Sequence, residues 1–516
     1  MKPLNANIII PMLLLAIYAL FLAQPINLVT ADLGRHIKNG EIVFQNTGVL
    51  KTNFYSYTHP DFPAINHHWL SGIIFFLVWK LSGLFGVHGF FIILSLITLG
   101  IFYALALKRS NILVATLTGF LIIPILLERK EIRPEIFSYL FGGIYFWILL
   151  KVKSGEYKPN RLFILPVLQI IWANLHIYFF MGPLLIGIFL AESFIKKSPL
   201  TKRLGLVFIA SITATALTPF GINSTLAPLT IFQNFGYHLV ENQTVWFIEK
   251  ILPNPNFFIF KIIFSVLILS FILRARHKPR VVWPDLLLGL ALAAAGWLAI
   301  RNFAIFGLFA LPIISENIAA GLSRIGVAGR PNKNLDSLKN KLAVIGLLII
   351  VLLATFSGEL RAIYPYSQDF YLGEEKLNSA GAEFFKKENL KGPIFNNYDI
   401  GGYLIFHLWP RERVFVDNRP EAYPADFFTK IYIPMQENKK IWDEQNSIYK
   451  FNAIIFSYRD YTPWGQTFFR RILEDPDWVT VFADSRVVIL LKNNELNKNI
   501  IAKYGRSIKI GHQTTN

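Results

Sequence analysis

The chain has 516 residues, of which 53% are hydrophobic and 16% are charged, and long apolar runs recur through its first 358 residues. This composition excludes a single soluble globular domain and is typical of a polytopic membrane protein. The formal net charge is +18, and the absence of cysteine excludes disulfides and thiolate metal sites.

The apolar runs predict a polytopic α-helical membrane protein with about eleven transmembrane helices in residues 1–358. The first run lacks a convincing small-residue cleavage site, so we expect an anchor and not a signal peptide. The predicted spans are residues 8–26, 87–107, 111–127, 136–150, 162–176, 177–195, 204–218, 256–273, 284–300, 303–319 and 342–357.

The loops between these spans differ in their content of Lys and Arg. With a cytoplasmic N-terminus, the loops that face the cytoplasm hold 19 Lys and Arg in 54 residues, whereas the opposite set holds 9 in 109. Because basic loops stay inside, we expect an integral plasma-membrane protein with its N-terminus inside and loop 27–86 outside. A span at 69–86 would invert all later loops, so residues 69–85 are predicted to form a juxtamembrane helix at the outer interface. Binding to anionic lipid explains the basic charge without a nucleic-acid partner.

Residues 359–516 alternate helix-like and strand-like stretches. This pattern predicts a C-terminal extracytoplasmic α/β domain with a mostly parallel sheet. The expected helices are 374–388 and 402–408, and the expected strands are 394–396, 414–417, 453–458, 478–483 and 487–492, the last two forming a hairpin.

The segment after the first span carries the strongest candidate site. On a helical continuation, Asp32, Arg35 and His36 lie at positions i, i+3 and i+4 and share one face. A carboxylate there suits a general base toward a hydroxyl acceptor, and Arg and His suit contacts to phosphate oxygens. The alternative is a structural Asp–Arg pair that caps the span. His67 and His68 follow in the same loop, without a third ligand at the spacing of a zinc site.

Short motifs recur along nearly the whole chain: Asp32, His36, Gly40-Glu41, Tyr55-Ser56-Tyr57-Thr58, His68-Trp69-Leu70, Arg133-Pro134-Glu135, and residues 172–176, 218–221, 397–404 and 414–419. In these motifs the chain resembles the GT-C glycosyltransferases. The resemblance implies transfer of a sugar from a polyprenyl-phosphate carrier at the outer membrane face, and His68 as a substrate contact. Many enzymes of that group have two adjacent acids or Asp-x-Asp in the first loop, whereas Asp32 precedes Leu33-Gly34. The sequence therefore leaves open whether a divalent cation is a cofactor.

The resemblance also implies a second acidic motif after the third span. Residues 128–135 occupy that place and hold three acids and three bases. Glu131 is then the second candidate catalytic residue, and Arg129 and Arg133 are candidate ligands of the donor phosphate. A solvated, self-paired loop is the alternative.

Two further polar residues interrupt apolar sequence. His176 separates two apolar runs at a short outer turn, and Arg301 divides two predicted spans. Each is a candidate substrate contact, because ionisable groups near lipid are costly to keep. The alternatives are a structural turn for His176 and a scaffold pair with Glu241 or Glu249 for Arg301. The loop 219–255 is expected to form an interfacial helix or a lid.

These observations predict a membrane glycosyltransferase of the cell envelope that acts on a lipid-linked sugar donor and a glycan, lipid or protein acceptor, with Asp32 as candidate general base. A transporter or flippase of lipid-linked saccharide and a non-catalytic envelope scaffold are the alternatives. A transporter is expected to carry ionisable or helix-breaking residues at mid-membrane on paired repeats. The conspicuous polar residues gather at one face instead, which favours the enzyme.

The predicted topology can be tested with reporter fusions. Fusions after residues 156, 200, 278 and 335 should report a cytoplasmic location, and a fusion after residue 360 should report the outside, because the basic loops stay inside. A cytoplasmic signal from the fusion after residue 360 would contradict the arrangement.

Overall fold

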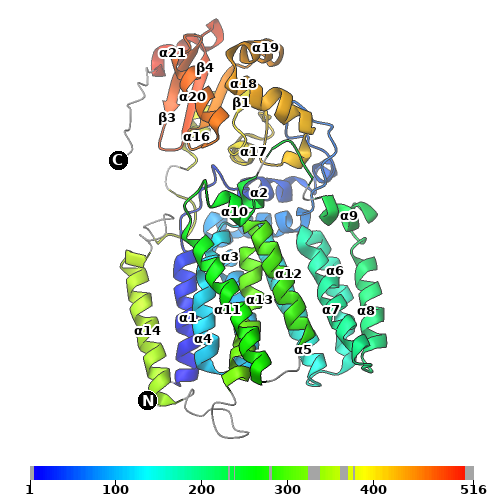
Figure 1. Ribbon diagram of the computed structural model, residues 1–516. Coiled ribbons are helices and arrows are strands. Elements are labelled where there is room, and N and C mark those ends of the chain that lie inside the picture. Colours follow the sequence, from blue (N-terminus) through cyan, green and yellow to red (C-terminus); the bar gives the residue numbers. More distant parts are fainter. Residues whose placement is uncertain are drawn as a thin grey trace. The chain divides into compact units, whose positions relative to one another are not determined.

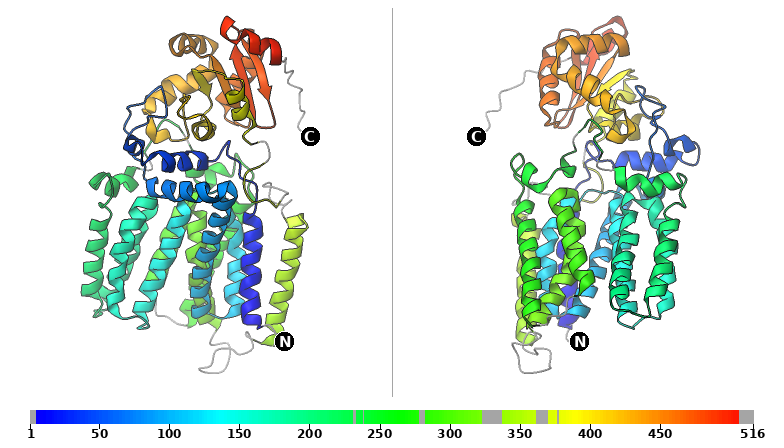
Figure 2. Two further views of the ribbon diagram at one scale, coloured as in Figure 1. Left: turned by 180° about the vertical axis from the view of Figure 1, so that it is seen from behind. Right: turned by 45° about the vertical axis from the view of Figure 1, so that its right-hand side comes forward.

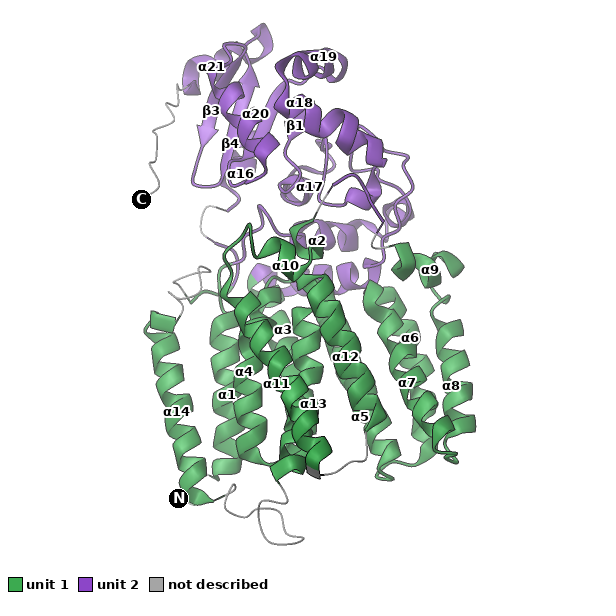
Figure 3. Cartoon of the chain, viewed as in Figure 1, with its two compact units in different colours: residues 1–25, 85–231, 239–372 green, residues 26–84, 232–238, 373–516 purple. Residues whose placement is uncertain are grey.

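The computed structural model describes residues 5–230, 233–237, 239–277, 282–322, 337–360, 370–375 and 378–505. The chain folds into two compact units that interleave along the sequence (Figure 3). Unit 1 comprises residues 1–25, 85–231 and 239–372, and unit 2 comprises residues 26–84, 232–238 and 373–516. Loop 27–86, which the sequence analysis assigned to the membrane half, thus lies almost entirely in unit 2.

Unit 1 is a bundle of helices that run side by side (Figures 1 and 2). Each predicted span falls on one of its described helices, and α13 packs between α4, α11 and α12. The helices are α1 Ala6–Leu22, the second part of α3 Trp69–Arg109, α4 Ile112–Leu126, α5 Glu135–Lys153, α6 Ile164–Leu175, α7 Met181–Ile195, α8 Thr201–Ala214, α9 Ile222–Thr230, α10 Val245–Ile248, α11 Pro255–His277, α12 Trp283–Leu298, α13 Phe303–Leu322 and α14 Leu338–Phe356.

Several of these helices have the length and composition of membrane spans. Among the described residues, seven helical stretches are long and apolar enough to cross a bilayer, and α1 and α12 are shorter apolar helices. The chain is therefore a multi-pass membrane protein by composition and fold. The count of eleven spans and the orientation stay predictions.

A network of buried and partly buried charges joins four helices of unit 1. Arg109 at the end of α3 contacts Asp285 of α12 and Glu316 of α13, and Arg274 of α11 lies 3.0 Å from Glu316. Asp285 is fully buried. Because an unpaired charge in an apolar bundle is costly, these groups hold the four helices in one arrangement.

The helix α3 is broken at Ser82 and Gly83, where the backbone leaves the helical region and Gly83 has φ +64°. This φ favours glycine, since it has no Cβ to clash. The break confirms that residues 69–81 form a helix separate from the span that follows. Their position at the outer interface stays a prediction.

Unit 2 contains a four-stranded sheet with the strand order β1-β2-β4-β3. Only β1 and β2 are parallel; β2 and β4, and β4 and β3, are antiparallel. The strands are β1 Ile394–Asn396, β2 Ala453–Ser457, β3 Trp478–Ala483 and β4 Val487–Lys492. The helices are α2 Leu33–Ile42, the first part of α3, α16 Ala380–Lys387, α17 Gly401–Leu408, α18 Ile433–Glu437, α19 Lys439–Tyr449, α20 Pro463–Glu474 and α21 Lys498–Tyr504.

Two predictions for this unit are wrong. The sheet is not mostly parallel, because β4 of the hairpin pairs antiparallel with β2 as well as with β3. The Asp484 carboxylate, which accepts bonds from the Arg486 and Val487 amides, turns β3 back into β4. The segment 414–417 is not a strand of the sheet either. Val414 forms an isolated parallel bridge with Ser56 of the first loop. The hairpin itself and the strands β1 and β2 are confirmed.

The helix α2 packs very closely against its neighbours in unit 2. A Cβ on Gly34 would lie 2.8 Å from the Phe406 Cβ of α17, and a Cβ on Gly40 would lie 2.0 Å from the Gly72 carbonyl oxygen of α3. Glycine at these positions lets the helix backbones approach each other. The position of α2, and of Asp32 before it, depends on these two contacts.

Substitution Gly40→Ala tests this packing. The added methyl group must push apart two helix backbones, so we expect a loss of about 1–3 kcal/mol in stability, as for other overpacked sites. Thermal unfolding of the detergent-purified protein measures the loss. Gly100→Ala in α3 is the matched control, because its Cβ would meet nothing within 4 Å, and an equal loss from both variants would contradict the packing argument.

Candidate functional site

Asp32 stands at the N-cap position of α2, but its side chain makes no capping hydrogen bond. Its Oδ1 accepts a hydrogen bond from the Asn418 side-chain amide and lies 3.6 Å from Arg35 Nη2. The ion pair with Arg35 follows from the i, i+3 spacing that the sequence showed. The Asp32 side chain is 19% exposed, so the carboxylate is positioned by two partners without being enclosed.

Asn418 is the residue of this group that sequence reasoning missed. Its Nδ2 donates to Asp32, and its Oδ1 accepts a hydrogen bond of 3.2 Å from Arg35 Nε. It lies 386 residues from Asp32 along the chain. No local spacing reveals such a pair, and only the motif 414–419 had drawn attention to the segment.

The two neighbours of Asn418 form a buried ion pair. Arg419 Nη2 lies 2.7 Å from Asp417 Oδ2 and 2.7 Å from Asn53 Oδ1, and Asp417 is fully buried. A charge left alone at such a site would be strongly destabilising. The pair therefore acts as a scaffold that fixes Asn418 beside Asp32.

The candidate histidines His36, His67 and His68 lie in the same unit. The rings of His36 and His68 meet edge to face with centroids 5.5 Å apart, and the centroids of His67 and His68 are 6.5 Å apart. Burial lowers the pKa of His67 to about 4. At neutral pH, His67 is therefore uncharged and can meet a substrate only through neutral hydrogen bonds.

No metal centre is assembled by the described residues. Nowhere in them do three or more His, Cys, Asp or Glu side chains lie in an arrangement that could hold a metal ion. The side chains around Asp32 therefore do not fit a cation site of that kind.

Unit 1 contains a second group, which we call the arginine cluster: Arg129, Arg133 and Arg301. All three guanidinium groups face the Glu241 carboxylate. The nitrogen–oxygen distances to Glu241 are 2.6 Å from Arg129, 2.9 Å from Arg133 and 3.9 Å from Arg301. Burial raises the pKa of Glu241, but the three guanidinium groups outweigh it and hold that pKa well below its usual range.

Each arginine of the cluster has a further partner. Arg129 binds Glu135 through two hydrogen bonds of 2.5 and 2.8 Å. Arg133 binds the Glu131 carboxylate, whose side chain is 47% exposed, and Arg301 donates to Asn242 at 2.9 Å. The loop 128–135 is thus largely self-paired, and residues from the loop 219–255 complete it.

His176 is buried beside this cluster. Its backbone is extended, which separates α6 from the short helix η4 Ile177–Phe180. Its Nδ1 lies 2.8 Å from the Ser138 hydroxyl and accepts a bond from the Tyr178 amide. The Tyr178 ring lies 5.6 Å from the Arg301 guanidinium. These contacts favour a structural role for His176 at the turn.

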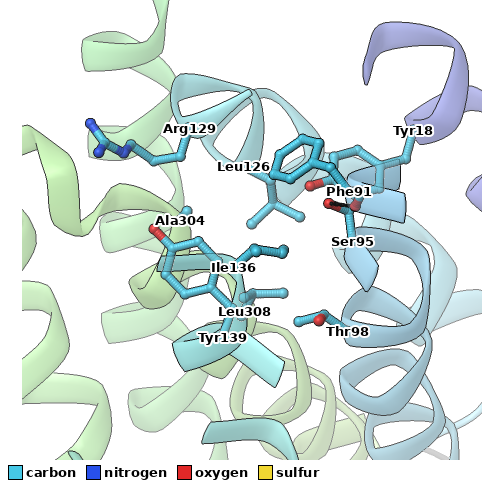
Figure 4. A pocket seen from close by; sticks show the side chains of 10 residues that line it. All are labelled: Tyr18, Phe91, Ser95, Thr98, Leu126, Arg129, Ile136, Tyr139, Ala304 and Leu308. Carbon is cyan, nitrogen blue, oxygen red and sulfur yellow. Dashed lines mark hydrogen bonds between the residues drawn. The ribbon is translucent and has the colours of Figure 1, made fainter. Parts of the chain in front are cut away.

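A small pocket in unit 1 reaches Arg129 (Figure 4). Both aliphatic side chains and hydroxyl groups line it, and it is large enough for about one water molecule. The lining residues are Tyr18, Phe91, Ser95, Thr98, Leu126, Arg129, Ile136, Tyr139, Ala304 and Leu308.

The predicted site residues thus fall into two groups. Unit 2 holds Asp32, Arg35, His36, His67 and His68, and unit 1 holds Arg129, Glu131, Arg133, His176 and Arg301. Sequence reasoning named these residues but did not find Asn418, or the position of Glu241 at the centre of the arginine cluster.

Comparison with known proteins identifies the fold. No family model and no curated protein matches the sequence. The structure, however, resembles the archaeal oligosaccharyltransferase AglB from Archaeoglobus fulgidus in complex with an inhibitory peptide and a dolichol-phosphate, with a TM-score of 0.60 at 11% identity, over 94% of this chain and 74% of that one. The apo form of the oligosaccharyltransferase from Archaeoglobus fulgidus gives a TM-score of 0.58 at 11% identity, over 88% and 70%. The chain therefore has a GT-C-like fold, as these oligosaccharyltransferases have, and the predicted fold class is confirmed.

The pKa of His67 predicts a pH dependence of stability. Because the pKa is lowered to about 4 in the folded state, the unfolded chain binds more protons between pH 4 and about 6.5. The contribution of the neutral, buried His67 to the free energy of unfolding is fully present above about pH 6.5 and is lost as the pH falls toward 4. In thermal unfolding of the purified protein, His67→Gln should lose less stability over this range than the native chain. Above pH 7 both should respond in parallel, and identical acid profiles would contradict the burial of His67.

Proposed function

We propose that this protein is a membrane glycosyltransferase that moves a sugar from a polyprenyl-phosphate-linked donor to an acceptor outside the cytoplasmic membrane. The observation that carries the proposal is the Asp32 carboxylate, positioned by Asn418 and Arg35 in a GT-C-type fold. The solved neighbour with a dolichol-phosphate and a peptide supports a lipid-linked donor, and the acceptor is a glycan, a lipid or a protein.

Asp32 acts as the general base in this proposal. Its carboxylate takes the proton of the acceptor hydroxyl, and the acceptor oxygen then bonds to the sugar's anomeric carbon. The bond from that carbon to the phosphate oxygen breaks, and the polyprenyl phosphate leaves with the electron pair. A single displacement of this kind inverts the anomeric centre. Asn418 and Arg35 orient Asp32 for this step.

The arginine cluster binds the phosphate of the donor in this proposal. Guanidinium groups form charge-assisted, bidentate hydrogen bonds with phosphate and stabilise the charge that develops on a leaving phosphate. Arg129, Arg133 and Arg301 are held in place by surrounding residues, which reduces the cost of ordering them on binding. The excess of Lys and Arg in the predicted cytoplasmic loops supports an orientation with the N-terminus inside and residues 359–516 outside.

Mass spectrometry of lipid and glycan fractions tests the proposed activity. Cells that lack the protein should accumulate a glycosylated polyprenyl phosphate and lose a glycosylated product. Unchanged fractions in both pools would contradict the proposal.

Substitution Asp32→Asn tests the base in the same assay. The amide keeps the shape of the side chain but cannot take the proton, so transfer should fall by about 10²–10⁴-fold, the usual range for general acid–base catalysis. Asp61→Asn, at an exposed position of the same loop, is the matched control and should transfer normally. Near-normal transfer by the Asp32→Asn protein would show that Asp32 has a structural role.

A further inference from the structure

We infer that the Glu241 carboxylate occupies the binding position of the donor phosphate in the arginine cluster until a polyprenyl phosphate displaces it. This inference rests on the proposed function, because it takes the incoming anion to be the phosphate of the lipid-linked donor. The chemistry recognised is a phosphate monoester or diester on an apolar chain.

The geometry of the cluster is that of an anion site. Arg129 comes from the short helix η2 Leu127–Arg129, Arg133 from the loop before α5, and Arg301 from the short helix η6 Ile300–Asn302. The three side chains converge on a single carboxylate from these separate elements. Guanidinium groups that converge on one point repel one another, and each offers several hydrogen-bond donors. An oxyanion at that point accepts these bonds and balances the charge.

Three glutamates among the described residues form ion pairs with the arginine cluster, and of these only Glu241 is shared by all three arginines. Glu135 is 4% exposed and forms its ion pair with Arg129, and Glu131 forms its ion pair with Arg133. Glu241 is 21% exposed. An anion that replaced the Glu241 carboxylate would contact all three arginines, and the ion pairs of Glu131 and Glu135 would stay intact.

The segment that carries Glu241 buries little of its surface. The short helix η5 Val240–Asn242 contains no buried residue, and Val240 is 50% exposed. The helix α10 Val245–Ile248 that follows is anchored by its buried side chains Val245 and Ile248 and by the stacking of Trp246 on Trp297, whereas η5 itself is held by Glu241 and by the Asn242 bond to Arg301. Because η5 buries no residue of its own, it opens at low cost, and the carboxylate can leave while α10 and the arginines stay in place.

An entirely structural role for Glu241 predicts a different outcome. In that case the carboxylate stays bound to the arginines at all times, and neutralising it weakens the cluster without improving any binding. Affinity for a phosphate therefore distinguishes the two roles.

The first experiment compares Glu241→Gln with the native chain. Isothermal titration of the detergent-purified proteins with geranyl phosphate should show binding that is about tenfold tighter or more for Glu241→Gln, because the competing carboxylate is gone. Glu249→Gln is the matched control: it removes the same charge from the same segment, but Glu249 pairs with Lys261 and not with the cluster. Its affinity should equal that of the native chain. Equal or weaker binding by Glu241→Gln would overturn the inference.

A second experiment keeps Glu241 in place, so its result does not depend on the folding of the Glu241→Gln protein. The chain contains no cysteine, and Val240→Cys therefore gives a single site for a nitroxide label. Geranyl phosphate should raise the mobility of the label, and geraniol, which lacks the phosphate, should leave it unchanged. An unchanged spectrum at a concentration where titration shows full occupancy would overturn the inference.

These results separate the inference from the proposed function. If cells show protein-dependent transfer but Glu241→Gln gains no affinity, the inference fails and the function stands. If Glu241→Gln gains affinity but no glycosylated product depends on the protein, the anion site stands and the transferase function fails.

Discussion

The close approach of α2 to its neighbours is the constraint on which the candidate base depends. Gly34 lets α2 lie against α17, and Gly40 lets its backbone cross that of α3 at Gly72. Gly401 in turn leaves room for the Asp417 backbone, since a Cβ there would lie 2.4 Å from its Cα. These backbone contacts allow little sliding, so they fix the distance over which Asn418 reaches Asp32. Side chains of any size at these positions would move the carboxylate and its amide partner apart.

Paired charges organise unit 1 in two different ways. The network around Arg109 contains Asp285, which is fully buried, and it joins α3, α11, α12 and α13. The arginine cluster instead pairs with Glu241, which is partly exposed on a short turn. Both satisfy the requirement that ionisable groups in an apolar bundle have partners. They differ in whether a carboxylate could be replaced by another anion. This difference separates the structural network around Arg109 from the arginine cluster, which is a candidate binding site.

The sequence predicted those features that follow from local patterns. Apolar runs identified the helices of unit 1, because a bilayer demands long apolar segments. The spacing of Asp32 and Arg35 predicted that they share one helix face, and the ion pair between them was the structural alternative. Predictions failed where a partner lies far away in the chain. The apolar segment 414–417 resembles a buried strand, but its partner is Ser56 and not the sheet. The bonds of Asn418 to Asp32 and of Arg129 to Glu241 span 386 and 112 residues, and no periodicity encodes such distances.

Two aspartates of unit 2 show why Asp32 and not Asp417 is the better candidate base. Both Asp417 oxygens are bound by the Arg419 guanidinium, and the side chain is fully buried. A substrate could not reach it, and protonating it would break a buried ion pair. Asp32 has a neutral amide as its hydrogen-bond donor, a looser ion pair at 3.6 Å and a partly exposed side chain. The amide orients the Asp32 carboxylate, and the partly exposed side chain lets an acceptor hydroxyl reach it.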